Sequence, residues 1–120
     1  KWNDTEVARI AVEAGADTSN KDDGTLNFST TTSGGSLTKR MVIDSSGHVL
    51  PGADNSYDLG SSSKRWRNVY TTDLKLSNEG SKNDVDGTWG NYTIQEGEDE
   101  LFLINNRNGK KYKFNLTEVS

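Results

Sequence analysis

The strongest secondary-structure pattern in the chain lies in residues 101–116, which read LFLINNRNGKKYKFNL. Residues 101–104 are apolar at every position, as expected of a strand that is buried from both sides. Residues 105–109 end in Asn-Gly, a turn signal, and apolar and polar residues then alternate over 111–116. The pattern predicts two antiparallel strands joined by a tight turn.

A third strand is predicted just before this hairpin. Residues 89–94, WGNYTI, have the composition of a strand and lead into the hairpin through the acidic loop 96–100, EGEDE. Three successive strands with short polar connections predict an antiparallel meander. We therefore interpret residues 76–120 as a C-terminal β-meander domain.

The beginning of the chain carries a more ambiguous pattern. Apolar and polar residues alternate over 8–14, but Val7, Ala8, Ala11 and Ala14 also fit one stripe of a helix. Gly15 ends the run after barely two helical turns, and helices of that length are marginal in isolation. A strand is therefore favoured.

Two further segments of this part of the chain also read as strands and turns. Residues 25–30 alternate cleanly between turn signals, and residues 39–43 and 48–50 flank the turn Asp44-Ser45-Ser46-Gly47. Pro51 ends the second of these strands. Residues 1–54 are accordingly interpreted as a segment of short antiparallel β-hairpins.

The composition of the chain indicates an oligomer. Leu, Ile, Val and Phe supply only 23 of 120 residues, while the net charge of −4 is small for a disordered chain. Ordering the backbone costs about 1–2 kcal/mol per residue, which so few apolar side chains hardly offset. Partner chains can supply the missing burial, since obligate oligomers often have no stable folded monomer.

The charge and hydropathy patterns argue against nucleic acid and against the membrane interior as partners. Residues 55–75 carry a net charge of +2 between acidic zones of −3 each, so no concentrated basic face for nucleic acid is expected. No apolar run approaches the roughly 20 residues that a membrane-spanning helix needs. We expect neither nucleic-acid binding nor membrane insertion.

The central segment, residues 55–75, lacks the regular alternation of the segments before and after it and reads as a serine-rich stretch followed by a short strand. Ser61 to Ser63 can cap a short helical turn in which Trp66, Val69 and Tyr70 share one face. Residues 72–76 alternate again and predict a strand.

Residues 40–70 resemble the distal part of bacteriophage tail fibres and tailspikes. The resemblance is carried by IDSSGHVLPG at 43–52 together with YDLGSSSKRWRNVY at 57–70, and the combination is specific. A looser likeness to the C-terminal segments of environmental phage fibres covers residues 86–112.

The resemblance implies an all-β, elongated and intertwined homotrimer, wound about one axis and carried in the virion as part of a tail fibre. Residues 1–54 would then form a fibre shaft segment, residues 55–75 a connecting trimerisation segment and residues 76–120 the tip domain. Trimer packing is expected at five aromatic and aliphatic positions, namely Tyr57, Leu59, Trp66, Val69 and Tyr70.

Receptor recognition is implied near the tip, with a host cell-surface glycan or outer-membrane receptor as the partner. Recognition surfaces favour aromatic anchors and arginine, which the tip domain offers at Trp89, Tyr92, Arg107 and Tyr112. Trp89 and Tyr92 fit a place in the trimer core equally well. The alternative function is a foldon-like segment that assembles the fibre without binding the receptor directly.

Enzymatic activity is not expected. Many relatives continue into a self-cleaving helical chaperone that begins with a Ser-Asp pair, whereas Thr72 precedes Asp73 here and the remaining residues are β-patterned. We predict no catalytic residue and no cofactor.

Three features resemble metal ligands but do not predict a site. His48 is the only histidine, so one chain cannot build a His-based cluster. The acidic loop 96–100 fits a solvated hairpin loop better than a calcium site or a carboxylate pair for glycan cleavage. Residues 83–87, NDVDG, lack the spacing and closing Glu of a calcium loop.

Overall fold

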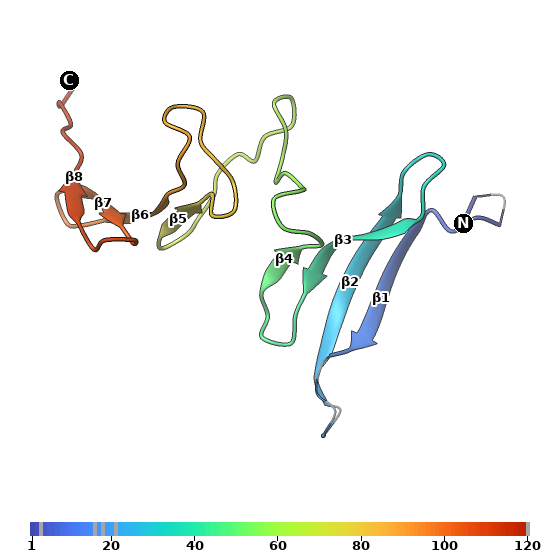
Figure 1. Ribbon diagram of the computed structural model, residues 1–120. Coiled ribbons are helices and arrows are strands. Elements are labelled where there is room, and N and C mark those ends of the chain that lie inside the picture. The colour runs from blue at the N-terminus through green and yellow to red at the C-terminus, as the bar shows by residue number, and fades with distance from the viewer. Residues whose placement is uncertain (3, 16, 18, 21, 120) are drawn as a thin grey trace. The chain divides into compact units, whose positions relative to one another are not determined.

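The computed structural model describes residues 1–2, 4–15, 17, 19–20 and 22–119. It is all-β, as predicted, with eight strands and no helix among these residues. The strands form two four-stranded antiparallel sheets, each with neighbouring strands in chain order (Figure 1). The chain divides into two units, residues 1–65 and 66–120, each holding one sheet.

The first sheet contains the four strands predicted in residues 1–54. They are β1 (Ala8–Ala14), β2 (Gly24–Thr31), β3 (Leu37–Ile43) and β4 (Val49–Pro51). The strand reading of residues 8–14 is thus confirmed over the helical one. A β-bulge between Phe28 and Ser29 leaves Arg40 as the extra residue of β3.

The second sheet is the predicted meander with one more strand at its start. It consists of β5 (Leu74–Ser77), β6 (Asn91–Glu96), β7 (Leu101–Asn105) and β8 (Lys111–Lys113). β5 and β6 each begin two residues later than the 72–76 and 89–94 predictions. The last strand is shorter than the alternation over 111–116 indicated, although the Phe114 N–H still donates to the Leu101 carbonyl at 3.0 Å.

The β7–β8 turn follows the Asn-Gly signal. Asn105 N–H donates to the Lys110 carbonyl and Gly109 N–H to the Asn105 carbonyl, both at 2.8 Å. Gly109 has φ of 72°, a left-handed conformation that costs glycine little. This local chemistry explains why the hairpin is readable from sequence.

The helical turn considered for the central segment does not form. Ser61 N–H donates to the Lys64 carbonyl at 2.9 Å, and the Lys64 N–H donates to the Ser61 side chain at 3.0 Å. Serine side chains offer the backbone such alternatives to a helix. Trp66, Val69 and Tyr70 therefore do not share a helical face.

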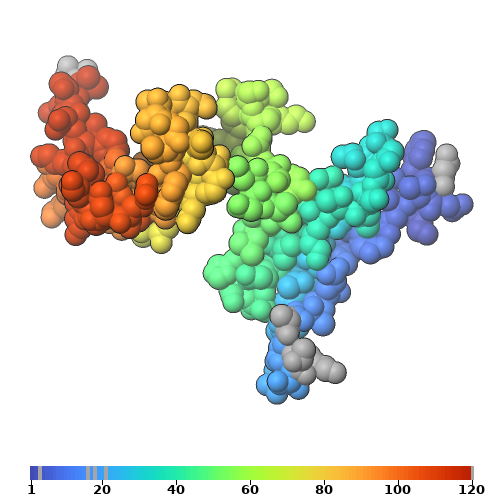
Figure 2. Space-filling model, viewed as in Figure 1, coloured from blue at the N-terminus to red at the C-terminus, as the bar shows by residue number. Residues whose placement is uncertain are grey.

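Neither sheet encloses a hydrophobic core within the described residues. The residues classed as fully buried there are polar, Asn27 at 1% exposure and Thr93 at 5%. Residues 101–104, expected to be buried from both sides, are half-buried or exposed in the single chain, with Phe102 at 36%. In the space-filling view the strands of the first sheet lie open at the surface (Figure 2).

Candidate surfaces for chain association and receptor binding

The strand registers collect apolar side chains on one face of the first sheet. Residues paired across antiparallel strands point to the same side, so each row of partners shares a face. Two adjacent rows each take one residue from each of the four strands, and both rows are wholly apolar. They contain Ile10, Phe28, Met41 and Pro51, and Val12, Leu26, Ile43 and Val49, and we call these eight residues the first apolar face.

The first apolar face is open to solvent in the single chain. Val12 is 80% exposed, Ile10 71% and Val49 64%. Removing apolar surface from water is worth about 25 cal/mol per Å². A sheet with one apolar face is stable only when another layer covers that face, so the single chain leaves this sheet incomplete.

The opposite face of the first sheet is mixed, because the row of Asn27 also holds Ala11, Val42 and Leu50 while the rows beside it carry charged and hydroxyl side chains. The Lys39 ammonium lies 2.9 Å from the Glu13 carboxylate, which joins β3 to β1 across the intervening β2. Asn27 of β2 is buried on this side, and its Nδ2 donates to Thr25 Oγ1 at 3.2 Å. The two faces of the sheet therefore differ in that the charged side chains and the buried amide lie on the opposite face alone.

The second sheet also has an apolar face, but a smaller and less exposed one. Its two rows hold six residues that we call the second apolar face, namely Leu74, Ile94, Leu103 and Tyr112 in one and Leu76 and Tyr92 in the other. The second row ends on Asn105. Leu74 and Leu76 are each 47% exposed and Tyr112 is 48% exposed.

The register separates the four residues considered for receptor binding. Tyr92 and Tyr112 belong to the second apolar face, where the Tyr92 hydroxyl accepts a hydrogen bond from Asn105 Nδ2 at 3.1 Å. Trp89 and Arg107 lie outside the strands, before β6 and in the β7–β8 turn. The single chain thus does not bring all four into one site.

Trp89 and Arg107 form a stacked pair. The Arg107 Cζ lies 3.9 Å from the centroid of the Trp89 ring, and its Nη1 donates to the Trp89 carbonyl at 2.8 Å. Such cation–π stacking holds the guanidinium plane against the indole. Among the described residues no carboxylate pairs with Arg107, so its charge is available to a ligand.

An amide cluster fixes the turn that carries Arg107. Asn106 Nδ2 donates to Asn91 Oδ1 and to Thr93 Oγ1, both at 2.9 Å. The Asn106 N–H donates to the Asn91 carbonyl at the same distance. Because these bonds tie the turn to β6, the Trp89–Arg107 pair is held on an ordered support.

The five residues considered for trimer packing lie in irregular segments. Four are strongly exposed, Leu59 at 80%, Trp66 at 64%, Val69 at 71% and Tyr70 at 91%. Tyr57 instead is held within its own unit. Its ring lies 5.2 Å from Arg40 Cζ, and its hydroxyl accepts a bond from Arg40 Nη1 at 2.9 Å.

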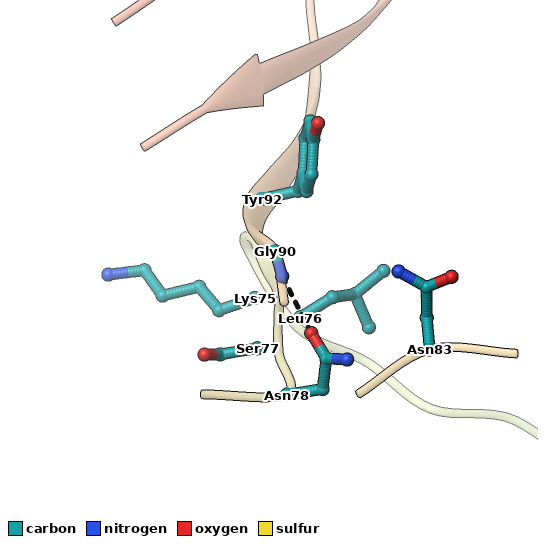
Figure 3. Close-up of a pocket in the computed structure, with 7 residues that line it drawn as sticks. All are labelled: Lys75, Leu76, Ser77, Asn78, Asn83, Gly90 and Tyr92. Carbon is teal, nitrogen blue, oxygen red and sulfur yellow. Dashed lines mark hydrogen bonds between the residues drawn. The ribbon is translucent and has the colours of Figure 1, made fainter. Parts of the chain in front are cut away.

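A groove of about 480 Å³ lies beside the start of β6 (Figure 3). It is lined by Lys75, Leu76, Ser77, Asn78, Asn83, Gly90 and Tyr92. Lys75 and Leu76 point to opposite sides of β5, and the Gly90 N–H donates to Asn78 Oδ1 at 2.7 Å. The lining offers one aromatic ring and several donors, but no carboxylate or imidazole that would act as a general acid or base.

The features weighed as metal ligands form local polar contacts. His48 Nδ1 lies 3.1 Å from Asp44 Oδ2, and Lys113 pairs with Glu100 of the acidic loop at 3.0 Å. Asp86 accepts bonds from Thr88 and Asn83, and the backbone N–H of Thr88 does most to lower the pKa of this carboxyl. No group of three or more His, Cys, Asp or Glu side chains in the described parts of the chain is placed to hold a metal ion.

Comparison with known proteins provides no relative: no protein family, curated protein or solved structure matches the chain. Within the described residues there is also no helix of the length and apolarity needed to cross a bilayer.

Sequence reasoning missed the apolar faces as candidate sites. The alternation in residues 8–14 and 25–30 was visible, but alternation in one strand does not say which strands pair or in which register. Only the pairing turns Ile10, Phe28 and Met41 into one continuous surface. Lining up the alternating residues across the predicted hairpins was the signal that could have revealed it.

Proposed function

We propose that this chain is the distal segment of a bacteriophage tail fibre, a homotrimeric module that recognises a receptor on the host cell surface. The resemblance of residues 40–70 supports the tail fibre, and the all-β fold with two single-layer sheets is compatible with it. Self-association supplies the second layer that each sheet lacks.

The exposed area of the single chain is the observation that supports the oligomeric part of this proposal. Its accessible surface is 10505 Å². Two separate compact units, each of half the chain's mass, would expose roughly 7,700 Å² in total. The excess lies in the range that obligate oligomers bury, which is about 2,000–5,000 Å² per interface.

The solution mass tests the oligomer. Light scattering coupled to gel filtration should give a mass near three times the 13.2 kDa of one chain. A mass that stays at 13.2 kDa at all accessible concentrations, with a cooperative unfolding transition, would contradict the fibre assignment.

The Trp89–Arg107 pair is the part of the second unit that we assign to receptor recognition. Stacked aromatic and guanidinium groups are enriched where surfaces bind partners, and this pair sits on an ordered turn. A fluorescently labelled chain should adsorb to susceptible host cells. Arg107→Ala should reduce adsorption, while Lys110→Ala, which removes a positive charge next to the same turn, serves as the matched control.

The assembly function remains the second candidate because the tip domain also exposes apolar groups, among them Leu76 at 47% and Tyr112 at 48%. Deleting residues 76–120 separates the two functions. If the shortened chain still forms trimers and the intact chain adsorbs to host cells, the tip domain serves recognition. If the shortened chain is monomeric and the intact trimer adsorbs to no susceptible host, assembly is the function of the tip.

A further inference from the structure

We infer that the first apolar face is the principal contact between chains, and that its occupant is the same face of further copies of this chain. The inference rests on the proposed homotrimer and says which surface builds it. It moves the contact from the irregular 55–75 segment to a regular sheet.

The chemistry of the face limits what can cover it. None of its eight residues carries a charge or a side-chain hydrogen-bonding group. The charged groups Arg9, Glu13 and Lys39 belong to rows of the opposite face. Arg9 and Glu13 each neighbour a face residue along β1, and the bulge at Arg40 pairs Lys39 with Ser29, in the same row as Arg9. A polar receptor would leave its own hydrogen-bonding groups unpaired here, whereas another apolar sheet face would not.

Symmetry makes a second copy the simplest apolar partner. In a closed ring of identical chains each subunit presents the same surface toward the axis. Sheets that pack face to face lie about 10 Å apart with interdigitated side chains, and rows of Ile, Leu, Val, Met and Phe suit such a layer.

The extent of exposure agrees with this partner. Val12 and Ile10 lie on the outer strand β1 and are the most open members, at 80% and 71%. Their openness accounts for part of the surface by which the chain exceeds two compact units. The second apolar face, with six residues and an Asn at the end of one row, offers less continuous area.

Two neighbouring residues of β1 provide a direct test. The chain has no cysteine, so Val12→Cys and Glu13→Cys each introduce a single thiol, on opposite faces of the same strand. In the assembled protein the thiol at position 12 should react with a maleimide at least about tenfold more slowly than the thiol at position 13, because it becomes accessible only when the assembly opens. In denaturant the two rates should converge.

The outcomes separate this inference from the proposed function. Equal reactivity of both thiols in a protein with three-chain mass would overturn the inference and leave the fibre proposal standing. A single-chain mass with the thiol at position 12 protected would show that the chain covers its own face, and both proposals would fall. Slow reaction at position 12 together with three-chain mass supports both.

Discussion

The two sheets share one topology, but their faces differ in residue composition. Each is a four-stranded antiparallel meander with an apolar face. On the first sheet that face is two full rows of apolar residues, and a salt bridge spans the opposite, mixed side. On the second sheet Tyr and Asn enter the apolar rows, and an amide cluster ties the end turn to the polar side.

From this difference between the two sheets we expect each to serve a different part of the proposed function. A face without polar groups gains free energy only by packing, so the first sheet suits assembly. A sheet that mixes apolar rows with fixed amides and a stacked Trp–Arg pair can pack on one side and present specific donors elsewhere. The predictions that follow compare matched positions of the two sheets.

A charge placed on either apolar face should have the largest effect on the assembly of the chains. Val12→Asp would bury an unpaired carboxylate in the assembly, at a cost of about 3–5 kcal/mol per chain. We expect the mass to fall from the oligomer to the single chain at micromolar concentration. Leu76→Asp should weaken assembly less, because its row already ends in the polar Asn105.

The single chain itself should tolerate Val12→Asp, since Val12 is 80% exposed there. Circular dichroism would then report retained β-structure in a smaller species. An oligomer of unchanged mass would show that the first apolar face lies outside the interface.

Alanine at two glycines should distinguish backbone contact from side-chain contact. A Cβ at Gly52 would clash with the backbone carbonyl oxygen of Lys39, so the backbone at the end of β4 must shift. A Cβ at Gly97 would meet the Phe102 ring edge at 2.7 Å, and that side chain can rotate away. We expect Gly52→Ala to destabilise by about 1–3 kcal/mol and Gly97→Ala by less than about 1 kcal/mol in urea denaturation.

Replacing the buried polar residue of each sheet by valine should change stability differently in the two sheets. Thr93→Val keeps the shape but removes an acceptor of Asn106, so a loss of about 1 kcal/mol is expected. Asn27 differs, because within the described residues its Oδ1 is buried without a partner. Asn27→Val should leave stability unchanged or raise it by up to about 1 kcal/mol. Equal losses in thermal denaturation would show that Asn27 Oδ1 does find a partner in the assembled protein.

The parts of the fold that were predictable depend on neighbours in sequence. The Asn-Gly turn at 108–109, the turn at 44–47 and the strand over 8–14 are specified by local chemistry and alternation, and the structure confirms them. β5 begins two residues late because Thr72 and Asp73 fit the alternation, while the pairing begins at Leu74. β6 does so because Trp89 and Gly90 fit a strand, while the pairing begins at Asn91. Propensity does not resolve where pairing starts.

The candidate site was less predictable for the same physical reason. Trp89 and Arg107 are 18 residues apart, and their stacking depends on the β6–β7 pairing and the amide cluster. Tyr92 and Tyr112 looked equivalent to them in sequence, yet the register places both on an apolar face. Long-range register therefore decided which aromatic residues group together.

Protonating one loop carboxylate in each unit, Asp44 and Asp86, should have the smallest effect on stability. The backbone N–H of His48 does most to lower the pKa of Asp44, as that of Thr88 does for Asp86. A carboxyl with a lowered pKa stabilises the fold above its ordinary pKa of 3.8, and this contribution disappears as pH falls through the lowered value. The midpoint of thermal unfolding should therefore fall with acid, and less steeply in Asp44→Asn and in Asp86→Asn.

His48→Ala is the control for the first loop, because it keeps the backbone N–H that donates to Asp44 at 2.9 Å. It should retain most of the acid dependence that Asp44→Asn loses. If the imidazole were the main partner instead, His48→Ala and Asp44→Asn would flatten the profile equally. Comparison with Asp86→Asn then tells whether the two units unfold together, since in one cooperative assembly either carboxyl shifts the same transition.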